Sequence, residues 1–263
     1  MTEQSESGQS EVGSSICDVI AALYLNGPTK SVAAQRAILD TLAHEHETAP
    51  THGNGAGDER KRLPFSAEDI AAHSGIKPGS PILWRLSPPK YWGLVDASPQ
   101  PVARVLLRYE DIQERYIAGV CAAIARLADR FEPAFGALHF RWTNPTPEHI
   151  ASMQNISAKA LEYSRYGIPG IFAWTWFGSA LTERLGGVTC LQGFGGSLRS
   201  WGGVFLPLTE QPWATPFQEL RACQIAVATR LRESGLFIDY SRTVPSQGVK
   251  WTPLAGARPT AGS

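Results

Sequence analysis

Apolar and polar positions along the chain predict alternating strands and helices. The run ICDVIAALYL, which begins at Ile16, is apolar and rich in β-branched residues, as expected of a buried strand. After Asn-Gly-Pro, residues 29–47 carry apolar side chains at helical spacing, and Thr29 is the expected N-cap. The pattern therefore predicts strand, turn and helix at the start of the chain.

The middle of the chain predicts a short helix, several strands and a long helix. Ser66 is followed three residues later by Asp69, which is typical of a helix N-terminus. Strands are predicted at 81–87, within YWGLVDA, and at 102–110. Apolar residues then recur every three or four positions over 111–130, and ALHFRWT returns to a strand pattern.

The last third continues this alternation. Its patterns predict a helix over 147–162, an apolar segment at 168–174, a short helix in FGSALTERLGG, strands in VTCLQGF and WGGVFLPL, a helix over 215–235 and a closing strand in LFIDY. The hairpin-like strand pairs favour an α+β fold with a mostly antiparallel sheet and packed helices. Two similar strand-helix-strand halves remain an option.

Composition divides the chain into one domain and two tails. Residues 1–14 and 241–263 are polar or rich in Pro, Gly and Ser, which predicts a disordered N-terminal tail and a flexible C-terminal tail. A single domain is expected over 15–240. Residues 48–64 combine Gly, Pro and charge without periodicity, so we expect a long loop there.

Charge, cysteine content and the lack of targeting patterns disfavour several classes of protein. Lys plus Arg and Asp plus Glu are 24 each, so no net field favours nucleic acid or an anionic membrane. The N-terminus lacks a signal-peptide pattern, and no apolar run is long enough to span a bilayer. Four dispersed cysteines indicate reduced core thiols. A soluble, cytoplasmic protein is expected.

Motifs with a recognised chemistry are weak here. HEHE at 44–47 places two histidines on different sides of a helix, which does not suit a shared metal ion. The glycines of QGFGGSLRSWGG are more typical of a hairpin turn than of a phosphate-binding loop, because a strand and not a helix is predicted to follow. We therefore predict no catalytic residue, no metal site and no cofactor.

The order of the predicted elements resembles a known family. Segments that carry the resemblance are VIAALYLNGPTKSVAAQRAILDTLAHE, RVLLRYEDIQERYIAGVCAAIARL, FGALHFRW, GIPGIFAWTWFGSALTERLGG and GGVFLPLTEQP. Over residues 16–238 they are similar to the bacterial immunity proteins associated with type VI secretion and polymorphic toxins. The similarity is strongest at 167–187, with its Gly-x-x-Gly entry, its Trp and its terminal Leu-Gly-Gly.

The resemblance implies a cytoplasmic protein that binds a cognate toxin effector and neutralises it by occlusion, without catalysis. Aromatic and charged residues of the Pro-rich loop region are candidate anchors for that partner, namely Trp84, Arg85, Tyr91 and Trp92. Two alternatives stay open. One is a small-molecule enzyme whose pocket is lined by aromatics near Trp174, Trp176 and Trp201. The other is a structural component of a larger assembly, and a homo-oligomer is compatible with each hypothesis.

Overall fold

One antiparallel sheet of ten strands forms the centre of the molecule, in the order β3-β2-β4-β5-β6-β1-β7-β8-β10-β9. The computed structural model describes residues 15–26, 31–54, 62–76, 80–96, 102–153 and 155–239. The strands are β1 (Ile16–Asn26), β2 (His52–Gly53), β3 (Leu63–Pro64), β4 (Ile82–Arg85), β5 (Tyr91–Asp96), β6 (Val102–Tyr109), β7 (Phe135–Trp142), β8 (Trp174–Phe177), β9 (Ser197–Leu198) and β10 (Val204–Pro207).

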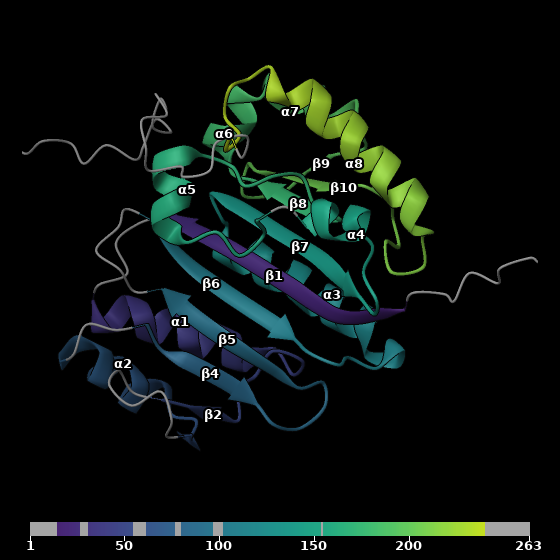
Figure 1. Cartoon of the computed structure of the whole chain (residues 1–263). Helices are drawn as coiled ribbons and strands as arrows, with labels where there is room; N and C mark the ends of the chain where they lie inside the picture. Colours follow the sequence, from purple (N-terminus) through teal and green to yellow (C-terminus); the bar gives the residue numbers. More distant parts are fainter. Residues whose placement is uncertain are drawn as a thin grey trace, which may run out of the picture.

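Helices cover both faces of this sheet. They are α1 (Val32–His44), α2 (Ala67–Ile76), α3 (Glu114–Phe131), α4 (Pro147–Met153), α5 (Ala160–Tyr166), α6 (Ser179–Arg184), α7 (Gly187–Gln192) and α8 (Phe217–Arg232). In the view of Figure 1, α1 and α3 lie behind the sheet, whereas α4 and α5 lie in front of it. The sheet is therefore the middle layer of three.

The central strand β1 pairs with β6 on one side and β7 on the other. Its side chains alternate between two cores, with Val19, Ala21 and Leu23 in one and Ile20, Ala22 and Tyr24 in the other. The first core packs against α1, α2 and α3, and the second against α5 to α8. A strand covered on both faces needs an almost continuous apolar run, which explains the sequence ICDVIAALYL.

Most predicted elements are confirmed, including the α+β class and the antiparallel sheet. Ser66 caps α2 as expected, since its hydroxyl accepts from the Asp69 amide at 3.2 Å. The N-cap of α1 is different. Ser31, not Thr29, caps this helix, and its hydroxyl accepts from the Ala34 amide at 3.1 Å.

Three predictions in the last two thirds are wrong in detail. VTCLQGF forms helix α7 and not a strand. The helix predicted over 147–162 is divided into α4 and α5, because the intervening chain turns inward to bury Ile156 and Ala158. The closing strand is reduced to one bridge between Phe237 and Ile168.

The remaining predictions concern the tails, the long loop, the cysteines and membrane-spanning segments. The two predicted tails lie outside the described residues, and the long loop at 48–64 contains the short strands β2 and β3. All four cysteines are free, but only Cys121 is a buried core thiol, whereas the other three are partly exposed. Within the described residues, no helix is long and apolar enough to cross a membrane.

Candidate functional site

The four sequence-predicted anchors lie on the hairpin formed by β4 and β5, and not in the Pro-rich loop itself. Trp84 pairs with Trp92, and Arg85 pairs with Tyr91. Since successive side chains of a strand point to opposite faces, the two tryptophans share one face and the Arg–Tyr pair shares the other. The structure therefore divides the predicted set into two pairs with different surroundings.

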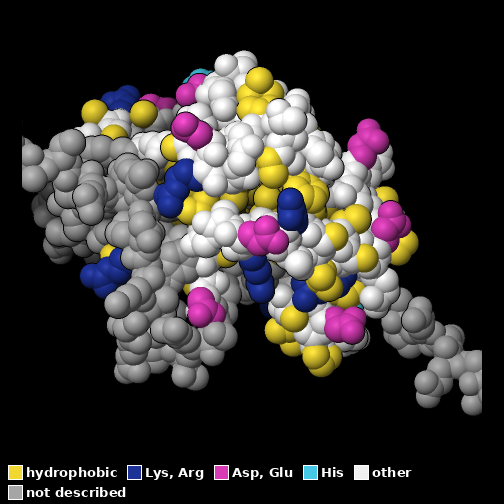
Figure 2. Space-filling view, turned by 90° about the horizontal axis from the view of Figure 1, so that it is seen from above, with side chains coloured by type: hydrophobic (Ala, Val, Ile, Leu, Met, Phe, Trp, Pro, Cys, Tyr) yellow, Lys and Arg dark blue, Asp and Glu magenta, His cyan; other side chains and the backbone are white. Residues whose placement is uncertain are grey.

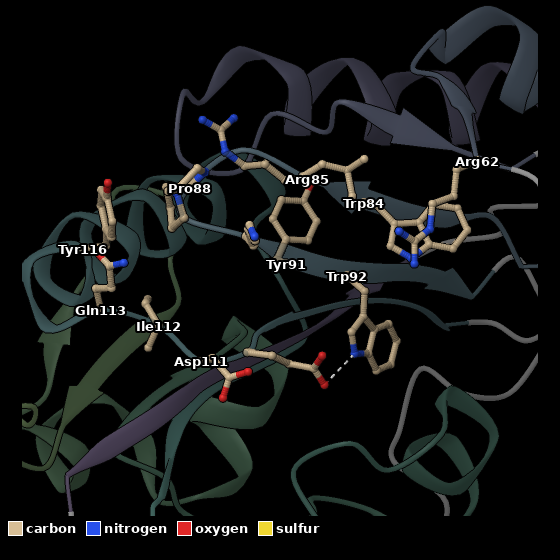
Figure 3. Close-up of a pocket in the computed structure, with 14 residues that line it drawn as sticks. Arg62, Trp84, Arg85, Pro88, Tyr91, Trp92, Asp111, Ile112, Gln113 and Tyr116 are labelled. Carbon is tan, nitrogen blue, oxygen red and sulfur yellow. Dashed lines mark hydrogen bonds between the residues drawn. The ribbon is translucent and has the colours of Figure 1, made fainter.

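Arg85 and Tyr91 serve mainly to hold neighbouring chain in place. They are only 7% and 4% exposed. Arg85 donates from Nη1 to the Ala49 carbonyl at 3.0 Å, and the Tyr91 hydroxyl donates to the Thr48 carbonyl at 2.6 Å. Burial raises the pKa of Tyr91 well above its usual range. In Figure 3 the Arg85 side chain leaves its strand on the side opposite Trp92.

Trp84 and Trp92 are half-buried and line a surface pocket. The guanidinium of Arg62 lies 5.3 Å from the centre of the Trp84 ring, which is cation–π geometry. Trp92 donates from Nε1 to Glu110 Oε1 at 3.3 Å, the bond drawn in Figure 3. The pocket has a volume of about 480 Å³, and its lining also includes Arg85, Tyr91, Leu86, Pro88, Pro89, Lys90, Asp111, Ile112, Gln113 and Tyr116, so that all four predicted anchors contribute to it. We call it the hairpin pocket.

A charged network anchors this pocket to the centre of the sheet. Glu110 Oε1 forms an ion pair with Arg108, at 3.2 Å from its Nε. Arg108 also bonds to the buried Asp18 at 3.0 Å, and Arg141 bonds to the same Asp18 oxygen at 2.8 Å. The network thus runs across β6, β1 and β7. Because it fixes the carboxylate of Glu110, it also fixes the orientation of the Trp92 indole.

The alternative aromatic region is packed core. Trp174 and Trp176 are buried, and their rings meet edge to face at 6.2 Å. Trp176 also stacks on Phe205 at 5.1 Å. Trp201 lies against Gly203 and donates from Nε1 to Asp129 at 3.2 Å. The aromatic residues of WTWF therefore serve as core packing. The two pockets described here are lined by other residues.

A second pocket, of about 940 Å³, was not foreseen from the sequence. It lies where the end of β7, the start of α4 and the start of α8 meet. Trp142, His149 and Phe217 form one wall, with ring centres 3.8–5.0 Å apart. Trp213 lies opposite Trp174 at 5.8 Å and completes the aromatic lining. We call it the aromatic pocket.

The charged groups of the aromatic pocket are both acidic. Glu114 and Glu148 are exposed at its rim, and its described lining contains no Lys or Arg. Desolvation lowers the pKa of His149, partly opposed by the charge of Glu148. His149 Nδ1 accepts from the Thr146 amide at 3.1 Å, as a neutral imidazole does.

The buried histidine of β7 and the HEHE segment both have structural contacts. His139 is fully buried and accepts from the Ala173 amide at 3.1 Å through Nδ1, while Nε2 lies 3.1 Å from the Ser152 hydroxyl. Within HEHE, Glu45 is buried and binds Arg126 at 2.8 Å. No group of three or more His, Cys, Asp or Glu that could hold a metal ion occurs among the described residues.

The architecture and the two pockets define an α+β protein built on a single antiparallel sheet. No protein-family model and no curated protein matches the sequence. Among solved structures, the chain is similar to the Pseudomonas aeruginosa T6SS protein PA0821, where T6SS denotes type VI secretion system. The TM-score is 0.57 at 12% identity, over 89% of this chain and 80% of that chain. At that identity the likeness shows a shared fold.

Proposed function

We propose that this chain is a type VI secretion immunity protein, which binds a cognate toxin effector and neutralises it by occupying its working surface. Two independent observations support the proposal. The fold is shared with a T6SS protein over most of both chains. The order of sequence segments also resembles the immunity family of that system.

The proposed binding site rests mainly on the pair Trp84 and Trp92. Both indoles are half-buried on one side of the β4–β5 hairpin, beside a pocket with basic and acidic walls. Tryptophan and arginine dominate the energetics of protein interfaces when they are fixed before binding. Arg62 and Glu110 provide that fixation through their contacts with the two rings.

The chemistry of the hairpin pocket favours occupation over catalysis. Its described lining contains no Ser, Cys or Thr beside a His, the commonest nucleophile and base pair, and its titratable residues are Lys90, Tyr91, Glu110, Asp111 and Tyr116 together with two arginines. Glu110 is held by Arg108 and Trp92. Figure 2 shows the molecule from above, on the side of α7 and α8 and away from the β4–β5 hairpin; there basic and acidic side chains are interspersed around apolar ones, which suits a mixed protein surface more than a polyanion.

The test is co-purification of the full chain with the product of each neighbouring gene, followed by growth assays. We expect one product to bind stoichiometrically, to be toxic alone and to be harmless when co-expressed. Trp84→Ala and Trp92→Ala should each weaken binding by about tenfold or more, the range of interface anchors. Ile225→Ala is the matched control, because Ile225 is a 50% exposed apolar residue on α8, outside the hairpin pocket.

Two results would overturn different parts of the proposal. If no neighbouring product binds or is toxic, the immunity function is wrong. If a toxin binds and the folded double variant Trp84→Ala/Trp92→Ala retains wild-type affinity, the function stands and the hairpin pocket is not its site.

A further inference from the structure

The aromatic pocket is assembled from segments far apart in the sequence. Trp142 ends β7, His149 lies on α4, and Trp213 and Phe217 lead into α8. In Figure 1 the ends of β7 and α4 and the start of α8 gather on the right-hand side of the molecule. The volume of about 940 Å³ is enough for a side chain together with part of the peptide that carries it.

Its walls are suited to a cation. The faces of indole and phenyl rings, here those of Trp142, Trp213 and Phe217, carry negative electrostatic potential, which attracts a guanidinium or ammonium group. Trp142 and Phe217 meet edge to face at 5.0 Å, and the His149 and Phe217 ring centres are 3.8 Å apart. Because these rings pack against one another, they are held in place before any ligand arrives.

The charged residues of the pocket also favour binding of a cation. Glu114 and Glu148 supply two carboxylates at the rim, without a Lys or Arg in the described lining. Arg221 lies close enough to feel the charge of Glu148, but its Nη1 donates to Gln224 Oε1. Both glutamates are in the first turn of a helix, where acidic residues are favoured anyway. That role alone does not account for an aromatic wall beside them.

We propose that the aromatic pocket binds an arginine side chain presented by an extended segment of a second protein. The planar guanidinium stacks on the aromatic wall, and its N–H groups donate to Glu114 and Glu148. This site is separate from the hairpin pocket and does not depend on the nature of the partner proposed above.

The experiment is a titration of the full chain with acetyl-Gly-Arg-Gly-amide, followed by the ¹⁵N–¹H signals of the Trp indoles. Trp213→Phe assigns the reporter signal. We expect saturable shifts of the Trp213 indole that weaken with added salt. The same peptide with citrulline in place of arginine is nearly isosteric but neutral, and it should bind at least about fivefold more weakly, as expected for a charge-assisted contact.

Variants locate the site. Glu114→Gln/Glu148→Gln should weaken the arginine peptide by about fivefold or more while leaving the citrulline peptide unchanged. Glu219→Gln is the matched control, since Glu219 is an exposed first-turn glutamate of α8 outside the lining. Equal binding of both peptides, or undiminished binding by the double variant, would overturn the proposal. Tetramethylammonium binding as tightly as the arginine peptide would also overturn it, in favour of a small ammonium ligand.

Discussion

Trp84 on β4 lies directly opposite Trp92 on β5, and both indoles stay half-buried although the residues next to them in the chain are buried. This arrangement separates two roles that adjoin in the sequence. The tryptophans stay partly exposed beside the hairpin pocket, whereas Arg85 and Tyr91 hold the segment around Thr48 and Ala49 against the sheet.

Tyr91→Phe should lower the free energy of unfolding by about 1–2 kcal/mol, because the buried Thr48 carbonyl loses its donor. Trp92→Phe keeps an aromatic ring at a half-exposed position, so we expect a change below about 1 kcal/mol. Urea unfolding of the two variants compares them directly. A larger loss in Trp92→Phe than in Tyr91→Phe would contradict this division of roles.

The site could be predicted from the sequence only in part. The hairpin and its aromatic residues follow from local pattern, and strand alternation alone would have divided Trp84 and Trp92 from Arg85 and Tyr91. The aromatic pocket could not be predicted in this way. Trp142 and Phe217 are distant in the sequence, and no local pattern indicates that β7 ends where α8 begins.

The fold was predictable where side-chain periodicity is strong, as in β1 and α3. It was not predictable where contacts between residues distant in the sequence determine the local structure. VTCLQGF has strand-like β-branched residues, but Gly186 and Gly187 take positive φ and let the chain turn directly into α7. Between α4 and α5, the carbonyl of Ala158 accepts from the Tyr24 hydroxyl at 2.6 Å and from Arg104 at 2.8 Å. These long-range bonds favour an interrupted helix.

Asp18→Asn should destabilise the protein by about 1.5–3 kcal/mol, the range for losing charged hydrogen bonds, because the two arginines are partly exposed and Arg108 keeps its ion pair with Glu110. Asp18 is 0% exposed and binds both Arg108 and Arg141, so the variant leaves two guanidinium groups without their shared carboxylate. Asp40→Asn is the control. It breaks only the exposed 3.6 Å pair with Arg36, which contributes below about 0.5 kcal/mol. Similar losses in the two variants, measured by urea unfolding, would refute a structural role for the network.

Stability should fall as the pH is lowered below about 6.5, the ordinary pKa of histidine in an unfolded chain. Burial, with a smaller contribution from Arg221, lowers the pKa of His139 to about 3. The unfolded state therefore binds a proton that the folded state excludes between these values. Above the unfolded-state pKa of histidine, the contribution of His139 to the free energy of unfolding is fully present. Between the unfolded and folded pKa values, about 1.4 kcal/mol of it is lost per pH unit for this one proton.

His139→Asn tests this pH dependence. Asn can still accept from the Ala173 amide, but it does not titrate. We expect lower stability at pH 7 and a shallower fall between pH 6 and pH 4, measured by urea unfolding. Part of the decrease in stability with falling pH should remain, because the pKa of His149 is also lowered. An unchanged slope in the variant would assign the pH dependence to other groups.

Two glycine variants should change stability in opposite directions. A Cβ on Gly203 would lie 1.9 Å from Trp201 Cζ3 and 2.7 Å from the Phe177 carbonyl oxygen. Gly203→Ala must therefore displace the Trp201 ring and weaken its bond to Asp129, which costs about 2–4 kcal/mol. On α3, a Cβ on Gly119 would come no closer than 3.9 Å to Glu47. Gly119→Ala should stabilise the protein by about 0.5–1 kcal/mol through higher helix propensity. Thermal unfolding measures both variants. A higher melting temperature for Gly203→Ala, or a lower one for Gly119→Ala, would contradict these predictions.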